Sequence, residues 1–177
     1  MKDILRNFWG HLKTITKHRH AVIRHCFKVG IGFQGLFHDL SKYSPVEFLV
    51  GIKYYRGYKS PNDVERAKHG YSKAWLHHQG RNKHHFEFWR DYDVTTHLVA
   101  PVKMPVRYIK EMFCDRLAAS KIYMGEKYTE SHPIEYFRNG KAKEIAHPET
   151  MAILEEWLLM LAEKGEEETL RYIKNVK

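Results

Sequence analysis

The sequence predicts an all-α protein that forms a single compact helical domain over residues 1–177. Apolar residues recur every three or four positions through most of the chain, which is the period of an amphipathic helix. Strand-like alternation of apolar and polar residues is absent from the sequence. The hydrophobic fraction is 43%, and no linker, repeat or low-complexity tract divides the chain, so one shared core is expected.

The first predicted helix covers residues 5–29, where apolar side chains step by three or four positions, and Gly30 ends it. The second helix begins at the sequence SPVE, Ser44 to Glu47, which is typical of a capping box with proline at the first helical position. We therefore assign Glu47 to helix capping and to no chemistry.

Three more helices are expected in the rest of the chain. The sequence SPND repeats the start signal at Ser60, and a single third helix is predicted from there to Gly80. Pro105 opens a fourth helix. The sequence HPET at His147 precedes the last amphipathic helix.

The net charge of +9 is unevenly distributed along the chain. Residues 1–90 hold 17 Lys/Arg against 6 Asp/Glu, a balance of +11, whereas residues 91–177 hold 13 against 15, a balance of −2. The basic half predicts an anionic partner, such as a phosphate ester or a nucleic acid. Because its basic residues are scattered among aromatic ones, a local phosphate site is favoured over a nucleic-acid track.

No apolar run approaches the 18 residues of a membrane span, and charges interrupt the N-terminal apolar pattern, so neither a membrane segment nor a secretion signal is expected. The two cysteines, Cys26 and Cys114, each adjoin a phenylalanine and are expected to be packed, reduced thiols. These features predict a cytoplasmic protein.

Nine of the thirteen histidines lie within residues 18–85. Four form two doublets and a fifth precedes an aspartate in apolar surroundings, giving His77, His78, His84, His85 and the pair His38–Asp39. A lone histidine on an apolar face is usually a core residue, but a cluster of this size favours a metal site. Imidazoles and carboxylates together suit manganese, iron, cobalt or catalytic zinc, and the CxxC spacing of a structural zinc site is absent.

Asp115 adds a second carboxylate to the candidate site. It lies on a predicted helix beside the apolar residues Cys114 and Leu117. Burial of a lone carboxylate is costly, so Asp115 is expected either to bind a cation as a ligand or to form an ion pair with Arg116 or with a neighbouring helix.

The order of these residues, a histidine, a His-Asp pair, further histidines and then an aspartate, resembles the HD-domain superfamily of helical metal-dependent phosphohydrolases. The sequence HDLSK at His38 is similar to that superfamily's HDxxK-type core, and HRHAV at His18 is similar to its first-helix pattern. The sequences CFKVG, QGLFHDLSKYSPVEF, GYSKAWLHHQGRNKHHFEFW and EMFCDRLAASK resemble more closely a bacterial HD-like family of unknown function. This resemblance covers about residues 15–125 and leaves residues 131–177 as C-terminal helices.

The resemblance implies an HD-like helical bundle that holds one or two divalent transition-metal ions. The first ion would be bound by His18, His38, Asp39 and Asp115. A second ion would draw on one histidine of each doublet, His77 or His78 and His84 or His85. Because His18 precedes His38 by only 20 residues, His20 and His25 stay open as alternatives for the first ligand.

Such a site implies hydrolysis of a small phosphorylated substrate, for example a nucleotide, because a bound ion lowers the pKa of water and polarises a phosphoryl oxygen. Asp39 is the expected bridging ligand. Lys42 is expected to contact the substrate phosphate or to be a solvated lysine at a helix end. Arg81, Asn82 and Lys83 are expected either to bind the anionic substrate or to form a polar surface turn. Two other functions stay open: a di-iron HD-type oxygenase, and a non-catalytic module that binds metal or nucleic acid.

Overall fold

The computed structural model describes residues 2–140 and 142–177, and the fold is a single, mostly helical domain, as predicted. The elements in chain order are α1 (Lys2–Lys28), α2 (Gly32–Gly35), the 3-10 helix η1 (Leu40–Tyr43), α3 (Pro45–Tyr54), α4 (Pro61–His69), α5 (Lys73–Gln79), η2 (Phe86–Phe88), β1 (Arg90–Asp93), β2 (Leu98–Pro101), α6 (Val106–Met124), η3 (Gly125–Lys127), α7 (His132–Asn139), α8 (Ala142–Ile145), α9 (Pro148–Lys164) and α10 (Glu166–Asn175).

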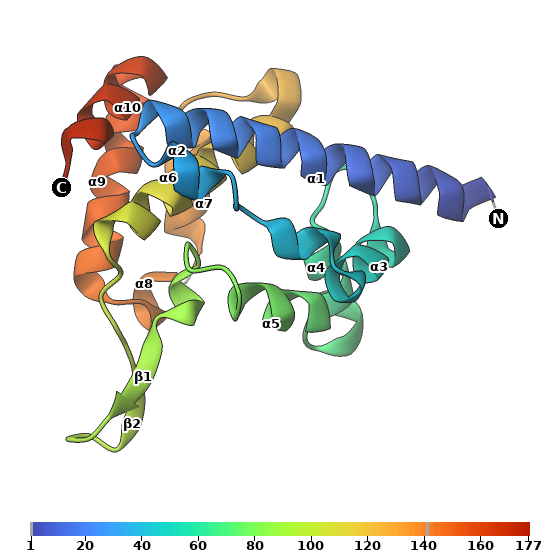
Figure 1. Ribbon diagram of the computed structural model, residues 1–177, viewed down its shortest axis with the longest axis horizontal. Coiled ribbons are helices and arrows are strands. Elements are labelled where there is room, and N and C mark those ends of the chain that lie inside the picture. Colours follow the sequence, from blue (N-terminus) through green and yellow to red (C-terminus); the bar gives the residue numbers. More distant parts are fainter. Residues whose placement is uncertain (1, 141) are drawn as a thin grey trace.

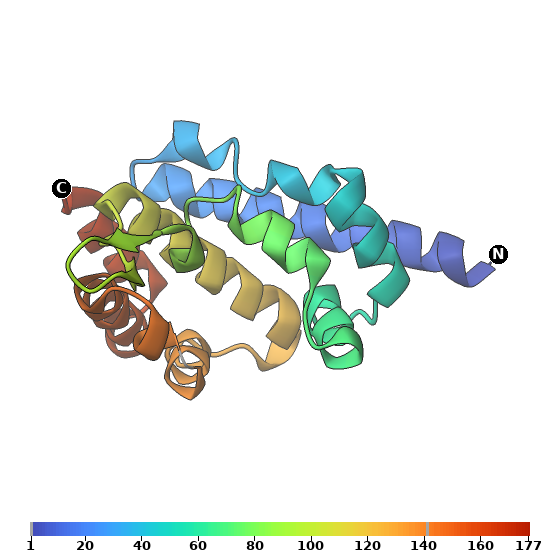
Figure 2. The same ribbon diagram turned by 90° about the horizontal axis from the view of Figure 1, so that it is seen from below.

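Helix α1 runs along the whole molecule and organises the packing of the other elements (Figure 1). It contacts α6 along its C-terminal part, α2 and α10 near its end, and α3 nearer its start. Figure 2 shows α6 on one side of α5 and η2, with α1 behind them. Residues from both halves of the chain therefore meet between α1, α5 and α6.

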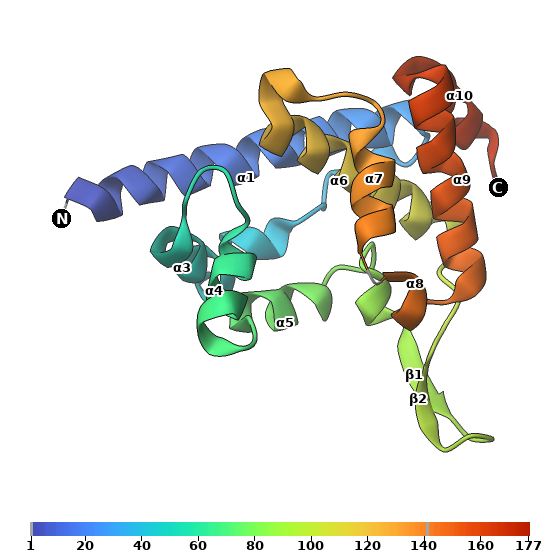
Figure 3. The ribbon, with the colours of Figure 1, turned by 180° about the vertical axis from the view of Figure 1, so that it is seen from behind.

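The hydrophobic core lies at the C-terminal end of α1, between α1, α6, α7, α9 and α10. Phe113 and Trp157 meet there edge to face, with ring centroids 6.3 Å apart. Cys26 and Cys114 are both free and buried in this core, as the sequence predicts. Figure 3 shows α7 beside α9 on the far side of the molecule from the view of Figure 1. This core fixes α6 against α1 and so positions the side chains that both helices present to the site.

The predicted third helix is wrong in one respect, because the structure divides it into α4 and α5. Gly70 ends α4 with a positive φ of 79°, which glycine adopts without strain. Ser72 then caps α5, and its side chain accepts a hydrogen bond from the Trp75 backbone N–H. The buried Glu65 carboxylate accepts a hydrogen bond from the Ser72 hydroxyl and thereby fixes the corner.

The capping box predicted for Ser44 to Glu47 is also wrong in its side-chain contacts. Helix α3 begins at Pro45 as expected, but Ser44 makes no side-chain capping bond. The Glu47 side chain is buried and turns toward His77 and His78. The start of α3 therefore depends on Pro45, and Glu47 belongs to the candidate site.

A two-stranded antiparallel sheet, β1–β2, was not predicted from the sequence. Asp93 forms its turn by accepting backbone hydrogen bonds from Thr95 and Thr96. Most residues of both strands are exposed, so the sequence shows no apolar alternation there. The hairpin projects away from the body of the molecule (Figure 1).

Within the described residues, no helix combines the length and the apolar character needed to cross a membrane.

Candidate metal centre

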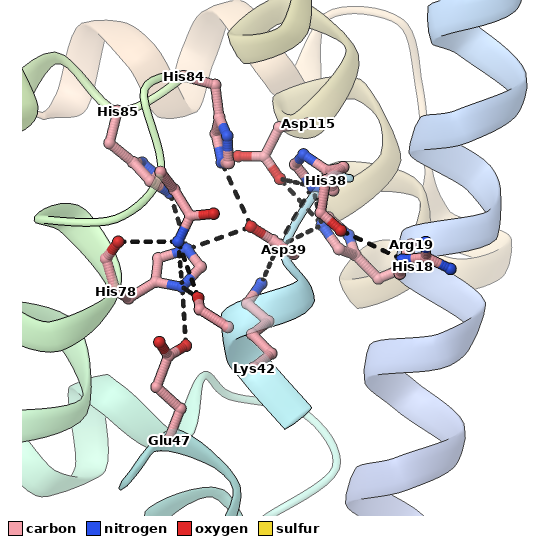
Figure 4. A network of polar contacts seen from close by, with 12 residues as sticks. His18, Arg19, His38, Asp39, Lys42, Glu47, His78, His84, His85 and Asp115 are labelled. Atoms are coloured by element: carbon pink, nitrogen blue, oxygen red, sulfur yellow. Dashed lines mark hydrogen bonds and ion pairs between the residues drawn. The ribbon is translucent and has the colours of Figure 1, made fainter. Parts of the chain in front are cut away.

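The side chains of the centre come from four separate parts of the chain and converge on Asp39 (Figure 4). Helix α1 supplies His18, and helix α6 supplies Asp115. Helix α5 supplies His78, and the segment after it supplies His84 and His85. The core positions α1 and α6, whereas the Ser72 cap positions α5, so each ligand candidate is anchored by secondary structure or by its immediate neighbours.

Asp39 has an unusual backbone conformation, with φ 55° and ψ 24° in the left-handed region. Aspartate tolerates this region better than most residues, and such conformations concentrate at functional sites. The sequence predicts that His38 and Asp39 lie on a short helical segment, but they lie in the turn before η1. Because the chain reverses there, both side chains are buried at 1% exposure.

The first group of donors, which we call cluster A, contains His18, His38, Asp39 and Asp115. His18 Nε2 lies 2.9 Å from an Asp115 oxygen and 3.6 Å from Asp39 Oδ2. His38 Nε2 lies 3.2 Å from the same Oδ2 and 3.5 Å from His18 Nε2. Ligand atoms at about 2.1 Å from one ion are roughly 3 to 4 Å from one another, so cluster A has the dimensions of a metal site.

The second group, cluster B, contains Asp39, His78, His84 and His85. It uses the other carboxylate oxygen, because Asp39 Oδ1 lies 3.3 Å from His78 Nε2 and 3.4 Å from His84 Nε2. His85 Nε2 approaches His78 Nε2 at 2.9 Å. The two clusters therefore share Asp39, with one oxygen turned to each.

Two glutamates orient the imidazoles of these clusters. Glu111 accepts hydrogen bonds from Nδ1 of His38 at 2.9 Å and Nδ1 of His84 at 3.1 Å. Glu47 accepts from Nδ1 of His78 at 2.8 Å. A carboxylate at Nδ1 leaves Nε2 free as a donor atom and fixes the plane of the ring, as is usual around protein-bound metals. Neither glutamate was predicted as a site residue, although Glu111 precedes Asp115 by one helical turn.

Three of the convergent donor atoms make no hydrogen bond with a described residue. Both oxygens of Asp39 and Nε2 of His84 are buried without a hydrogen bond from the described residues, and their close contacts are the ion pairs given above and one with Lys42. Buried atoms of this kind are costly unless a proton or a cation occupies the space between them. The buried donor sets of both clusters could hold a metal ion.

The pKa values show how the charges balance when protons occupy this space. Burial disfavours the charged form of His38, but the Asp39 carboxylate and hydrogen bonds with Asp115 and Glu111 raise its pKa well above the usual range. Burial would likewise raise the pKa of Asp39, but His38, Lys42 and other cations lower it strongly. Bound metal must displace these protons, so metal binding and protonation compete.

Glu111 is held in its charged form by its histidine partners. Burial alone would raise its pKa, but the hydrogen bonds from His38 and His84 lower it to about 2. The pKa of His85 is lowered well below its usual value by burial and by the neighbouring His84 and His78. A neutral imidazole at His85 is the form in which histidine binds metal.

The structure distinguishes the alternatives that the sequence leaves open for the histidines. His18 lies in cluster A, whereas His20 is exposed and His25 faces Glu166. In the first doublet, His78 joins cluster B and His77 instead bonds to Glu47. Both histidines of the second doublet join cluster B.

The residues predicted to bind substrate fall into three different environments. Lys42 lies at the centre, with its Nζ 2.5 Å from Asp39 Oδ2. Asn82 is buried, and its amide donates to Ser41 Oγ and to the His78 carbonyl. Arg81 and Lys83 are exposed beside a small pocket of about 170 Å³ that reaches His84 and Glu111 from outside.

A much larger cavity of about 1010 Å³ reaches the centre. Five residues of the centre are part of its lining: His18, Lys42, His78, His85 and Asp115. Its walls extend along one face of α1 and of α6, and over α3 and α7. This volume is at the upper end of the range for small-molecule sites, so the centre is accessible to a ligand.

Comparison with known proteins identifies the family of this chain. The model for a family described as "Family of unknown function (DUF5662)" matches residues 7–160. The chain belongs to this family. The DUF5662 match includes every residue of clusters A and B, together with Glu47 and Glu111. No curated protein and no solved structure matches the chain.

Proposed function

We propose that this protein is a metal-dependent phosphohydrolase that acts on a small phosphorylated substrate. The observation that carries the proposal is the division of Asp39 between two donor clusters, one oxygen to each, whose other members His18, His78, His85 and Asp115 line a large cavity. Two ions that share a carboxylate can clamp the attacking and the leaving oxygen of a phosphoryl group and can generate a nucleophile from water at neutral pH. The resemblance of HDLSK and its companion motifs to the HD-domain superfamily supports the same reaction.

The residues of the chain have distinct tasks in this proposal. The Nε2 atoms of His18, His38, His78, His84 and His85, with the oxygens of Asp39 and Asp115, would hold the ions. Glu111 and Glu47 orient the imidazoles, as described above. Lys42, close to Asp39 and at the cavity wall, is the cation nearest to a phosphoryl group bound at the centre. Divalent manganese, cobalt, iron or zinc suits this mixed nitrogen and oxygen donor set.

A di-iron oxygenase is the second candidate, and the nitrogen-rich donor set of cluster B favours it. Three of its four donors are imidazoles, which suit iron well. The two candidates differ in their requirements. An oxygenase consumes oxygen and needs iron, whereas the hydrolase works without oxygen and with manganese or cobalt.

The test is phosphate release from a panel of phosphomonoesters and nucleotides by protein loaded with manganese or cobalt under anaerobic conditions. We expect hydrolysis of at least one compound, and a loss of at least roughly 100-fold in His18→Ala, because cluster A loses a ligand. His20→Ala is the matched control, since His20 lies on the same helix but is exposed, and it should retain full activity.

The proposed hydrolase activity would be contradicted if fully metal-loaded protein released no phosphate from any compound of the panel. If the same protein loaded with iron consumed oxygen in the presence of one of the panel compounds, the oxygenase would replace it. If His20→Ala lost as much activity as His18→Ala, the assignment of cluster A would be wrong.

A further inference from the structure

Arg116 is a cation in the cavity wall that forms no ion pair with a described residue. It follows Asp115 on α6 and lines the large cavity. The sequence allowed an ion pair between these two neighbours, but no ion pair or hydrogen bond of the Arg116 guanidinium with a described residue is present. Its Nε is buried and has no hydrogen-bond partner among the residues that the structure describes. The guanidinium instead lies over the Phe137 ring, 5.7 Å from its centroid.

The other basic side chains at the cavity differ from Arg116. The charge of Lys42 is already compensated by Asp39 at 2.5 Å. Lys59 is exposed, so its charge is solvated. Arg116 alone among these three combines a buried polar atom with the lack of an acidic contact.

Arg116 shares its part of the cavity wall, which we call the recess, with residues from η2 and α7. Glu87, from η2, lines the same cavity, and its Oε2 is also buried without a hydrogen-bond partner from the described residues. Glu87 and Arg116 nevertheless do not approach within ion-pair distance. Tyr136, from α7, lies on the same wall. The recess therefore holds a guanidinium nitrogen and a carboxylate oxygen that make no hydrogen bond with a described residue.

A guanidinium is suited to bind an oxyanion in such a recess. Its planar fork of N–H donors matches a carboxylate or a phosphate in a bidentate arrangement. The Phe137 ring lies within cation–π distance of the guanidinium, and the Arg116 Nε makes no hydrogen bond with a described residue. Burial disfavours the charge of Arg116, the nearby Asp115 and Glu87 offset part of this cost, and an anionic group hydrogen-bonded to the guanidinium would offset more of it.

We propose that Arg116 binds a second anionic group of the substrate while the first, a phosphoryl group, lies at the metal centre. This inference rests on the proposed function and narrows it. The substrate is then a phosphate ester that carries a further oxyanion, either a second phosphate or a carboxylate. Phe137 positions the guanidinium, and the cavity between α6 and α7 holds the part of the substrate that joins the two anions.

Calorimetric titration of manganese-loaded protein with three non-hydrolysable probes tests the proposal. Methylphosphonate carries one anionic group, methylenediphosphonate carries two phosphonates, and phosphonoacetate carries a phosphonate and a carboxylate. We expect Arg116→Gln to weaken binding of at least one two-anion probe about 10- to 100-fold, the range for a charged hydrogen-bonded contact. Binding of methylphosphonate should change less than about threefold. The two-anion probe that is affected identifies the second group as phosphate or carboxylate.

Arg107→Gln is the matched control, because Arg107 also lies over an aromatic ring, that of Tyr108, but is exposed and outside the large cavity. It should bind all three probes like the unmodified protein. Arg116→Lys, which keeps the charge but not the fork, should bind the affected probe with intermediate strength, and it replaces Arg116→Gln if that variant does not fold.

Equal binding of all probes by Arg116→Gln and the unmodified protein would overturn the proposal. Equal weakening of methylphosphonate and the two-anion probes would also overturn it, because Arg116 would then contact the group at the metal. The titration measures binding and requires no turnover. If the protein released no phosphate but still preferred two-anion probes in an Arg116-dependent way, the proposed hydrolysis would be wrong and the anion site at Arg116 would stand.

Discussion

Glu111 connects the two donor clusters at the level of single residues. Its Oε1 accepts from His38 of cluster A and from His84 of cluster B, while Gln34 donates to Oε2 at 2.5 Å. One carboxylate therefore contacts a histidine of each cluster and fixes the orientation of both rings. This is the arrangement by which residues outside the ligand set tune a metal site.

We expect Glu111→Gln to lower metal affinity about 10- to 100-fold, since the amide can no longer accept from both imidazoles with full charge. Metal-competition titration with a coloured chelator measures the change. Glu65→Gln is the control, because Glu65 is an equally buried glutamate whose contacts are Ser72 and Ala74. A loss of affinity as large in Glu65→Gln would show that the effect is one of general destabilisation.

His11 predicts a specific dependence of stability on pH. Burial, with a smaller effect of the Lys42 charge, lowers its pKa from 6.5 to about 4. Below pH 6.5 the unfolded chain therefore binds a proton that the folded protein does not, and stability falls until about pH 4, where both forms are protonated. The loss across this window is about 2 to 3 kcal/mol.

In His11→Gln this part of the acid dependence should disappear. Urea unfolding at several pH values between 7.5 and 4 measures it, and His20→Gln, an exposed change on the same helix, should unfold like the unmodified protein. An unchanged slope in His11→Gln would mean that His11 titrates normally in the folded state.

At the level of elements, the close approach of α1 and α3 depends on Gly51. A Cβ atom at this position would overlap the His11 ring, which also lies 5.3 Å from the Phe48 ring. The two helices form one side of the cavity, so their spacing affects the shape of the site.

We expect Gly51→Ala to destabilise the fold by about 1 to 3 kcal/mol through overpacking. Gly80→Ala is the matched control, because a Cβ atom there would lie at ordinary van der Waals distance from its nearest neighbour, the Leu76 carbonyl oxygen. Thermal and urea unfolding of both variants provide the comparison. If Gly51→Ala were as stable as Gly80→Ala, α1 and α3 would not be packed as closely at Gly51 as described.

The elements also show which features a sequence can predict. Periodicity and the proline starts predicted α1, α3 and α6 closely, because these helices depend on local spacing and on Pro45 and Pro105. The break between α4 and α5 depends on one left-handed glycine, and the hairpin depends on Asp93 turn contacts, neither of which alters the apolar period.

The candidate site was predictable in its residue types and less so in its geometry. The His-Asp pair and the two doublets indicated the donors, whereas the doublets alone could not show that His77 turns to Glu47 while His78 turns to Asp39. The Ser44–Glu47 spacing indicated that Glu47 caps α3. Only the tertiary structure shows that the Glu47 carboxylate instead binds histidines of α5. Such contacts join residues about thirty positions apart.

At the scale of the whole molecule, the centre joins two halves of different character. The core of α1, α6, α7, α9 and α10 supports one side, while the more basic N-terminal half brings His38, Asp39 and the doublets to it. Three of the acidic residues of that half are buried: Asp39, Glu47 and Glu65. The charge on its outer surface is therefore more positive than the net charge of its sequence indicates. This surface favours the approach of an anionic ligand.

Metal removal should therefore weaken the contact between the two halves. We expect treatment with a chelator to lower the unfolding midpoint measurably, and added manganese to restore it, because ions that bind only the folded state stabilise it. Differential scanning calorimetry measures both changes. Asp39→Ala should show no response to chelator, since both clusters lose their shared ligand.

The most direct measurement is an anomalous-scattering map from crystals of the metal-loaded protein, recorded on both sides of the metal absorption edge. Two peaks should lie on opposite sides of the Asp39 carboxylate, each about 2.1 Å from the Nε2 atoms of its own cluster. A fully loaded crystal whose metal peaks lie away from Asp39, with His38 and His78 still bonded only to protein groups, would contradict the shared-carboxylate centre.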